Sequence, residues 1–451
     1  MKLEEKVIET IEKYNMLSPG DTIVVGVSGG ADSTALLSVL CSVKEKFDLC
    51  LHIAHINHKL RGDEANRDSD YVRSLSQKHG LPFHLLECDV AAKAKELGIS
   101  EEAAGREVRY NFFNEILSKN GGTKIAVAHN KGDSTETTLI NLIRGSSLNG
   151  LKGICAVNGN IIRPLIECDR ESIEEYLAEK SIPFMTDSTN GENIYTRNII
   201  RNTVIPDMLK INPRVVSTIY ENSILIGDED DFISKVCDEY AKKCITCSND
   251  CVTVDFSQIP QLHIAAKRRL IFKACEMINE SKRNISSVNI NSVLSLPTGG
   301  RTFFNGIFAE RCYDRFIFTD KQRQMCQFSY IAEGETLSVP ETGMEYSFKT
   351  VSAKDITKYE KNTIYLDADT LGVLTIRSRR DGDTFSPLGL GGRKKVKDFL
   401  IDMKIPRIAR DRMPVLETDG HIAALLCLRP DEAHKITDST TKILMISEVQ
   451  R

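Results

Sequence analysis

The sequence predicts an α/β fold, in which a doubly wound parallel sheet is followed by a helical domain and a small α+β C-terminal domain. Up to about residue 205, continuous apolar segments alternate with helical patterns, which is typical of parallel strands covered by helices on both faces. Pro206 and Pro213 then interrupt the pattern, a helical pattern continues to about residue 285, and short strands dominate from about residue 327. We therefore expect three domains, at 1–212, 213–325 and 326–451.

In the first domain, each predicted strand is followed by a predicted helix. The strands are apolar along their whole length, so helices must cover both faces of the sheet. In chain order, the predicted pairs are strand 22–27 with helix 33–43, strand 50–57 with helix 62–80, strand 83–90 with helix 100–121, and strand 124–130 with helix 134–145.

Composition and charge narrow the class of protein. The chain of 451 residues is 41% hydrophobic and 27% charged, which is ordinary for a soluble globular protein. Its formal net charge of -4 excludes a polycation, so nucleic-acid binding would need basic residues that gather locally. No run of 18 apolar residues occurs, and segment 1–17 predicts an amphipathic helix rather than a signal peptide. We therefore expect a cytoplasmic protein without a membrane span.

The 13 cysteines are scattered and odd in number, which indicates reduced thiols. Cys244, Cys247 and Cys251 are the exception, because they lie close together in the sequence. The C-x-x-C spacing could serve a metal, but no fourth ligand is evident nearby. Loop thiols are the favoured interpretation, and metal binding is the alternative.

A phosphate-binding loop is predicted between the first strand and the helix after it, in the sequence Ser-Gly-Gly-Ala-Asp-Ser at 28–33. Two glycines let backbone N–H groups converge on one point, and the helix N-terminus adds partial positive charge. Ser28 and Ser33 add hydroxyl donors, and Asp32 adds a carboxylate that could hold Mg²⁺. The loop lacks the lysine of the G-x-x-x-x-G-K-[ST] motif. The alternative is a tight turn in which Ser33 caps the helix.

Polar residues also follow the second strand, where His55, Asn57, His58 and Arg61 lie within seven residues. Ligands bind at the carboxyl ends of parallel strands, so these side chains are expected to face the loop. A lone histidine would more often be structural, but four polar residues at one strand end favour a site.

A second group follows the fourth strand, where His129, Asp133 and Glu136 occur at i, i+4 and i+7. Asp133 as N-cap and Glu136 at N3 would form a capping box, and a cap at this edge of the sheet also faces the cleft. Two carboxylates there could hold an ammonium group or take the proton that an attacking amine must lose. Arg106 and Arg109 lie on one face of helix 100–121, where either could bind triphosphate or simply be solvated.

Basic residues gather in two further stretches. Asp187 and Asn190 form a candidate pocket or an Asx turn, and Arg197 and Arg201 then give a basic face suited to phosphate or RNA. Between residues 371 and 451 the chain has 15 Lys and Arg against 11 Asp and Glu. A run of these basic residues follows Gly391-Gly392 and predicts an RNA-backbone contact, with a solvated face as the alternative: Arg393, Lys394 and Lys395.

The loop at 28–33 resembles that of the PP-loop ATPases, which have a Rossmann-like fold. That resemblance implies that ATP is cleaved between its α- and β-phosphates and that AMP is placed on a carbonyl oxygen. All the stretches quoted above, in this order, together with residues 376–416, resemble the tRNA(Ile)-lysidine synthetase family over essentially the whole chain.

That family resemblance implies a ligase of known chemistry. The C2 carbonyl oxygen of the wobble cytidine in a CAU anticodon is adenylated, and the side-chain amine of free lysine then displaces AMP, so that the isoleucine tRNA reads AUA instead of AUG. The implied cofactors are ATP and Mg²⁺, and the oligomeric state stays open, with a homodimer as one alternative. The candidate residues are, for catalysis, Asp32, Arg109, His129, Asp133 and Glu136; for ATP, Ser28, Gly29, Gly30, Ala31, Asp32, Ser33, His55 and Asn57; for the metal, Asp32; for lysine, Asp133 and Glu136; and for tRNA and its nucleotide, His58, Arg61, Asn190, Arg197, Arg201, Arg393, Lys394 and Lys395.

The chain departs from the family pattern beside the carboxylates. Asn130 stands where the family commonly has a second histidine, and Gly132 stands where it has an acid. A second histidine contact to ATP and an extra metal-binding acid are therefore not expected.

Two other functions stay open at this point. A PP-loop enzyme that inserts sulfur into tRNA would need a catalytic cysteine or a cysteine cluster, and no C-x-x-C occurs in the first domain. A catalytically decayed tRNA-binding protein is disfavoured because Asp32, Asp133 and Glu136 are all present.

Overall fold

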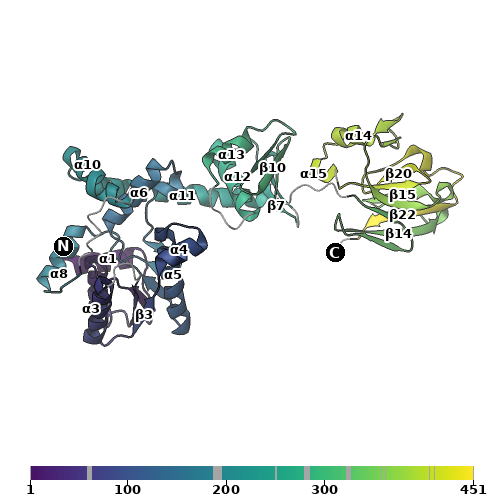
Figure 1. Cartoon of the computed structure of the whole chain (residues 1–451). Coiled ribbons are helices and arrows are strands. Elements are labelled where there is room, and N and C mark those ends of the chain that lie inside the picture. The colour runs from purple at the N-terminus through teal and green to yellow at the C-terminus, as the bar shows by residue number, and fades with distance from the viewer. Residues whose placement is uncertain are drawn as a thin grey trace. The chain divides into compact units, whose positions relative to one another are not determined.

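The structure is a computed structural model, and the chain divides into two compact units, Met1–Lys235 and Val236–Arg451 (Figure 1). Their boundary falls within helix α11 (Val215–Cys244), and the division into three domains stays a prediction. Among the described residues, no helix has the length and apolar character that a membrane span requires. The described residues are 2–57, 63–185, 196–248, 251–278, 285–320, 327–356, 358–360, 362–405, 407–410 and 412–449.

The first unit is built on one six-stranded sheet in the order β3-β2-β1-β4-β6-β5. All neighbouring strands are parallel except β5, which pairs antiparallel with β6. The predicted α/β fold with a parallel sheet is therefore confirmed. The strands are β1 (Thr22–Gly26), β2 (Cys50–Asn57), β3 (Phe83–Glu87), β4 (Lys124–Ala126), β5 (Val157–Asn158) and β6 (Ile161–Ile162).

The strand order reverses beside β1, and this reversal positions the site. From β1 the chain adds β2 and β3 on one side, and it then returns to place β4 on the other side of β1. In open α/β sheets, ligands bind outside the carboxyl ends of the strands at such a switch point. The segments that follow β1 and β4 are the predicted loop at 28–33 and the predicted carboxylate group.

Alternate residues of β1 pack into two separate cores. Ile23 and Val25 join a cluster with residues of α1, α2 and α8, whereas Val24 packs against Phe113 and its neighbours on α5. At the end of the strand, a Cβ on Gly26 would lie 2.7 Å from Phe113 Cζ, so this helix approaches the sheet closely because the residue is glycine. Helices cover both faces, as a doubly wound sheet requires.

The helices of the first unit match most of the predicted ones, and several were not predicted. Helix α6 begins at Lys131, three residues before the predicted start, and β3 and β4 end before the predicted limits. The N-terminal amphipathic helix is confirmed by the burial of Leu3, Val7 and Ile11 on one face of α1. The helices are α1 (Leu3–Lys13), α2 (Ala31–Val43), α3 (Asp63–His79), α4 (Val90–Leu97), α5 (Glu101–Lys119), α6 (Lys131–Ile143), α7 (Leu148–Leu151), α8 (Arg170–Glu179), α9 (Thr196–Ile199), a π-helical segment (Ile200–Val204) and α10 (Ile205–Ile211).

The first part of the second unit combines helices with a five-stranded sheet in the order β7-β8-β11-β10-β9. Strands β7 and β8 lie in a region whose pattern predicted only helix, and they are three and four residues long, too short for a periodic signal. The elements are β7 (Ile245–Cys247), β8 (Val252–Asp255), α12 (Ile264–Ile278), α13 (Ser287–Leu294), β9 (Arg301–Phe304), β10 (Ile307–Cys312) and β11 (Arg315–Thr319).

The C-terminal part contains two larger antiparallel sheets that share one core. Their orders are β12-β16-β19-β20-β21 and β13-β14-β22-β15, and Ile376 and Leu416 of the first pack with Phe348 and Leu444 of the second. The small α+β character predicted for this part is confirmed. The elements are β12 (Ser329–Ile331), β13 (Thr336–Val339), β14 (Met344–Ser352), β15 (Thr363–Asp367), β16 (Leu374–Ser378), β17 (Thr384–Phe385), β18 (Lys394–Lys395), α14 (Val396–Asp402), α15 (Arg407–Arg410), β19 (Pro414–Thr418), β20 (His421–Leu425), β21 (Arg429–Pro430) and β22 (Lys442–Glu448).

Candidate active site

The predicted phosphate-binding loop closes on itself through its two serines. The Ser28 N–H donates to Ser33 Oγ over 3.1 Å, and Ser33 Oγ donates to the carbonyl of Gly30 over 3.0 Å. Gly29 has φ +96°, a backbone conformation that favours glycine. Gly30, not Ser33, is the N-cap of α2, so the alternative of a Ser33 cap is wrong. The helix N-terminus is thus presented by a residue without a capping side chain, as anion binding favours.

Asp32, in the first turn of α2, is held by two donors from other elements. Asn130 Nδ2 donates to its Oδ1 over 3.0 Å, and Arg170 Nη1 pairs with its Oδ2. Its side chain is 25% exposed. Burial raises the pKa of the Asp32 carboxyl above its ordinary value, and the charge of Arg170 opposes that rise. The carboxylate is thus fixed at the rim of the loop while staying accessible.

Helix α6 carries the predicted carboxylate pair, with a cap that differs from the prediction. Asn130 is the N-cap, and its Oδ1 accepts from the Asp133 N–H over 3.1 Å, while the Asn130 N–H donates to Asp133 Oδ2 over 3.0 Å. The capping box therefore joins Asn130 and Asp133, and the predicted box of Asp133 with Glu136 is wrong. Glu136 lies in the second turn, with its side chain 3% exposed.

Two arginines neutralise these carboxylates. Arg197 Nε donates to Glu136 Oε2 over 2.7 Å, and Arg201 Nε donates to Glu136 Oε1 over 2.5 Å. Both guanidinium groups also reach Asp133 Oδ1, at 3.2 and 3.1 Å. The result is a cluster of one buried acid, Glu136, one half-buried acid, Asp133, and two arginines that are 32% and 43% exposed, called the active-site ion cluster below.

The two arginines come from α9 and from the π-helical segment, and such segments are frequent at functional sites. Burial alone would lower the pKa of the Arg201 guanidinium, but its bonds to Glu136 raise it overall. Both arginines were predicted to contact the nucleotide or tRNA. Their pairing with the predicted lysine-binding acids was not predicted.

His129 lies beside this cluster in its neutral form. Burial lowers its pKa to about 4, and its Nδ1 accepts from Arg163 Nε over 3.3 Å. Arg163 is 3% exposed and was missed by sequence reasoning, although its position directly after β6 was a usable signal. Arg109 is close enough to Arg197 for their charges to interact, and burial lowers its pKa.

The polar residues at the end of β2 are largely engaged within the protein. His55 is 4% exposed, with Nδ1 2.8 Å from the carbonyl of Val27 and Nε2 3.1 Å from Ser69 Oγ. Asn57 is 3% exposed and donates to Asn66 Oδ1 over 3.2 Å. His55 therefore supports the residue directly before the phosphate-binding loop. Asp187, His58, Arg61 and Asn190 lie outside the described residues.

The basic residues of the C-terminal part form a separate group in the second unit. Arg393 Nε donates to Thr384 Oγ1 over 2.8 Å, and Lys394 pairs with Asp402 over 3.2 Å. Lys394 and Lys395 form β18, which pairs with β17. These contacts fix the strand and leave the Lys395 side chain exposed.

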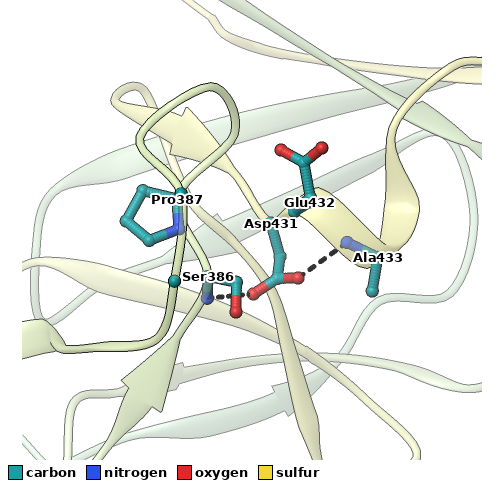
Figure 2. Close-up of a pocket in the computed structure, with 7 residues that line it drawn as sticks. Ser386, Pro387, Asp431, Glu432 and Ala433 are labelled. Atoms are coloured by element: carbon teal, nitrogen blue, oxygen red, sulfur yellow. Dashed lines mark hydrogen bonds between the residues drawn. The ribbon is translucent and has the colours of Figure 1, made fainter.

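The structure also contains a pocket of about 320 Å³ that was not predicted (Figure 2). Its lining includes Gly391 and Gly392, which shortly precede β18 in the sequence. Asp431 closes one side, because its carboxylate accepts from the N–H groups of Ser386 and Ala433 over 2.6 and 2.8 Å. Glu432 accepts from the Gly389 N–H and from Lys435. The two acids that line the pocket, Asp431 and Glu432, are thus held by other residues of the C-terminal part.

Among the described residues, the cysteines at 244–251 offer no comparable chemistry. Cys244 is buried, Cys247 is exposed, and Cys251 lies 3.2 Å from Ser248 Oγ through its thiol. Within the described part of the chain, no group of three or more His, Cys, Asp and Glu is arranged to hold a metal ion.

Family models match the chain in both compact units. Residues 2–208 match the family model described as a PP-loop domain, and residues 374–446 match the model described as the TilS substrate C-terminal domain. The chain is 38% identical to the tRNA(Ile)-lysidine synthase of Caldanaerobacter subterraneus, over 98% of this chain and 97% of the relative. It is 36% identical to the enzyme of that name from Clostridium acetobutylicum, over 98% of each chain. The chain therefore belongs to the tRNA(Ile)-lysidine synthase family.

Among solved structures, the U34-tRNA thiolase NcsA from Methanococcus maripaludis is similar with a TM-score of 0.43 and 15% identity, covering 50% of this chain and 78% of that one. A likeness of this size carries no argument about function.

Proposed function

We propose that this chain performs the reaction for which its family is named, and that it does so in two steps at the carboxyl end of the parallel sheet. ATP first adenylates the C2 carbonyl oxygen of the wobble cytidine in a CAU-anticodon isoleucine tRNA. The lysine side-chain amine then attacks C2, the C2–O bond to AMP breaks, and the amine loses a proton. The observation that carries the proposal is the convergence of Asp32, Asp133 and Glu136 at one switch point of the sheet.

The loop at 28–33 is the proposed ATP site. Its backbone and serine hydroxyls can bind phosphate oxygens, and the neutral imidazole of His129 and the guanidinium of Arg109 can contact ATP or the adenylate. Arg163 keeps the imidazole ring oriented. Adenylation is needed because a carbonyl oxygen is a poor leaving group until AMP is attached to it.

Asp32 fits a Mg²⁺ site of the kind that nucleotides complete. Mg²⁺ takes hard oxygen ligands and is usually bound by one or two carboxylates together with substrate phosphates and water. Asp32 offers one carboxylate at the rim of the loop, partly exposed and oriented by two donors. A bound Mg²⁺ would neutralise phosphate charge as pyrophosphate leaves.

Asp133 and Glu136 are the proposed lysine site. When lysine binds, it would take the place of the paired arginines, so the net charge around the two acids would change little. Lysine brings ammonium groups that can replace guanidinium as the partners of the two acids. It also brings an α-carboxylate that can pair with a released arginine. Because Arg197 and Arg201 are 32% and 43% exposed, they can turn toward a ligand without leaving a deep cavity. Released arginines also suit the phosphates of the tRNA.

The remaining substrate contacts are proposed from charge. His58, Arg61 and Asn190 are assigned to the nucleotide pocket, and Arg393, Lys394 and Lys395 to the tRNA backbone. We expect the enzyme to act in the cytoplasm, and a homodimer stays a prediction.

Two of the five thiols of the first unit, Cys41 and Cys168, are unsuited to sulfur insertion. Burial raises the pKa of Cys41 to about 11 and that of Cys168 to about 12, so both are protonated and poor nucleophiles at neutral pH.

The proposal is tested by incorporation of labelled lysine into a CAU-anticodon isoleucine tRNA transcript, with ATP and Mg²⁺ and with a methionine tRNA as control. Label in the isoleucine tRNA alone is the expected result. Absence of label in both, with ATP consumed only when a sulfur donor is supplied, would favour thiolation instead.

A further inference from the structure

Asn130 connects the two halves of the site. It is the last residue before α6, and the residue as a whole is 6% exposed. Its Nδ2 donates to Asp32 Oδ1 over 3.0 Å, and its Oδ1 accepts from the Asp133 N–H over 3.1 Å. One amide group therefore contacts the ATP loop through its donor and the lysine-site helix through its acceptor.

Helix capping explains only half of this arrangement. At α4 and α5, the N-cap residues Asp89 and Ser100 also accept from a first-turn N–H, at 2.9 and 3.3 Å. An acceptor is all that a cap needs, and serine or aspartate would supply it as well as asparagine. The donor side of Asn130 is not needed for the helix, and it points at Asp32, 98 residues earlier in the chain.

Asparagine is suited to lie between two acids. Asn130 contacts both carboxylates, since its Nδ2 donates to Asp32 Oδ1 and its backbone N–H donates to Asp133 Oδ2, each over 3.0 Å. An aspartate at 130 would add a third negative charge, and a serine would be too short to reach Asp32. Asparagine keeps the cap and donates to Asp32 while adding no charge.

We propose that Asn130 is a positioning residue, which orients the Asp32 carboxylate for the nucleotide and ties the phosphate-binding loop to the helix that carries Asp133 and Glu136. The inference rests on the proposed function only in taking Asp32 as the carboxylate of the ATP site. The other Asp32 oxygen is held by Arg170, so loss of Asn130 leaves the carboxylate held at one end only and able to rotate.

The test compares Asn130→Ser with wild type by calorimetric ATP binding across a Mg²⁺ titration, without tRNA. Groups that orient a metal ligand typically change metal affinity or activity by about 10- to 100-fold when removed, so the Mg²⁺ midpoint should rise by about 10-fold. ATP binding without Mg²⁺ and the unfolding midpoint should stay close to wild type, because the serine still caps α6. Asp89→Ser, which makes a similar change at the cap of α4, is the matched control and should leave the Mg²⁺ midpoint unchanged.

An unchanged Mg²⁺ midpoint in Asn130→Ser, or an equal change in Asp89→Ser, would overturn the proposal. If Asn130→Ser does not fold, Asn130→Asp replaces it, since aspartate has the same shape and caps equally well. It should fold and still lower the rate of tRNA adenylation at saturating Mg²⁺ by about 10-fold. Adenylation at the wild-type rate would overturn the proposal. ATP binding by Asn130→Ser is measured without tRNA, and the adenylation rate of Asn130→Asp is compared with that of wild type. A failure of the lysidine reaction itself is therefore distinguishable, because it would leave ATP binding intact and remove adenylation from the wild type as well.

Discussion

Both compact units contain a cluster of arginine and carboxylate side chains, and the active-site ion cluster differs in exposure from the cluster around Arg377. In the second unit, Arg377 donates to Asp383 over 2.9 and 3.0 Å and to Glu417 over 2.5 Å, and its side chain is 4% exposed. In the active-site ion cluster, Glu136 is 3% and Asp133 is 15% exposed, whereas Arg197 and Arg201 are 32% and 43% exposed. We therefore expect the two clusters to have different roles, because a ligand can replace exposed arginines more readily than a buried one.

The ratio of arginines to acids also differs between the two clusters. Arg377 faces two acids and also donates to the carbonyl of Ser378, so its donors are used within the fold. The active-site ion cluster has two acids and two arginines, and a zwitterion can enter it without leaving an unpaired charge. The C-terminal cluster is therefore expected to stabilise the fold, and the active-site ion cluster to bind substrate.

The largest expected effect on stability comes from Arg377→Met. Removing one partner of a buried ion cluster leaves uncompensated charge, which costs about 3–5 kcal/mol of unfolding free energy. Denaturant unfolding measures this cost. The control is Arg301→Met in the same unit, whose arginine is 34% exposed, and it should cost no more than about 1 kcal/mol. Equal costs would contradict the structural role of Arg377.

Arg201→Met should show the reverse pattern. Glu136 keeps Arg197 as a partner, so the unfolding free energy should fall by no more than about 1 kcal/mol. Lysine incorporation should fall by about 30-fold or more, because a substrate-exchange partner of a buried acid is lost. Incorporation and unfolding are measured on the same preparation. A variant that is unstable but fully active when folded would reverse the comparison between the clusters.

As the pH is lowered, the first unit should lose stability at a higher pH than the second unit. Burial lowers the pKa of five histidines there, and that of His129 to about 4, so the unfolded chain binds more protons below pH 6.5. The first unit should lose stability as the pH falls from about 6.5 toward 4.

The second unit contains His434, whose pKa is also lowered by burial, and Asp383. Although burial opposes it, the bond to Arg377 lowers the pKa of Asp383, and this contribution is lost only at pH values below the ordinary aspartate pKa. Hydrogen exchange followed across this range should show earlier opening in the first unit. Simultaneous opening of both would contradict the prediction.

The smallest effects concern the exposed basic residues. Arg393→Gln and Lys395→Gln should each flatten the dependence of log tRNA affinity on log salt by about 0.7–0.9, if each contacts one phosphate. Filter binding at several salt concentrations measures the slope. The control is Lys46→Gln, a change at a 55% exposed lysine of the first unit, and it should leave the salt slope unchanged.

Much of the fold was predictable because its signals are local. The strands β1 to β4 are apolar runs of sequence, and the loop at 28–33 has a composition that few turns share. The start of α6 was not predictable in the same way. Asn130 with Asp133 and Asp133 with Glu136 both have capping-box spacing, and only the tertiary contact of Asn130 with Asp32 distinguishes them.

The sequence identified the candidate site residues, but it did not predict which side chains they contact. Asp32, Asp133, Glu136, Arg197 and Arg201 were all identified from the sequence. Their partners lie 61 to 138 residues apart, and no local pattern specifies such pairs. Arg163 and Arg170 were missed for this reason, since Arg163 follows a two-residue strand, Arg170 begins α8, and each is significant only through a distant side chain.

In the proposed division of roles, the ATP loop activates the cytidine while Asp133 and Glu136 bind lysine. The most direct test is Glu136→Gln, with tRNA adenylation and lysine incorporation measured separately. Adenylation should stay near the wild-type rate, and lysine incorporation should fall by about 100-fold or more, because a buried charge partner is lost. Equal loss of both steps would contradict the division of roles.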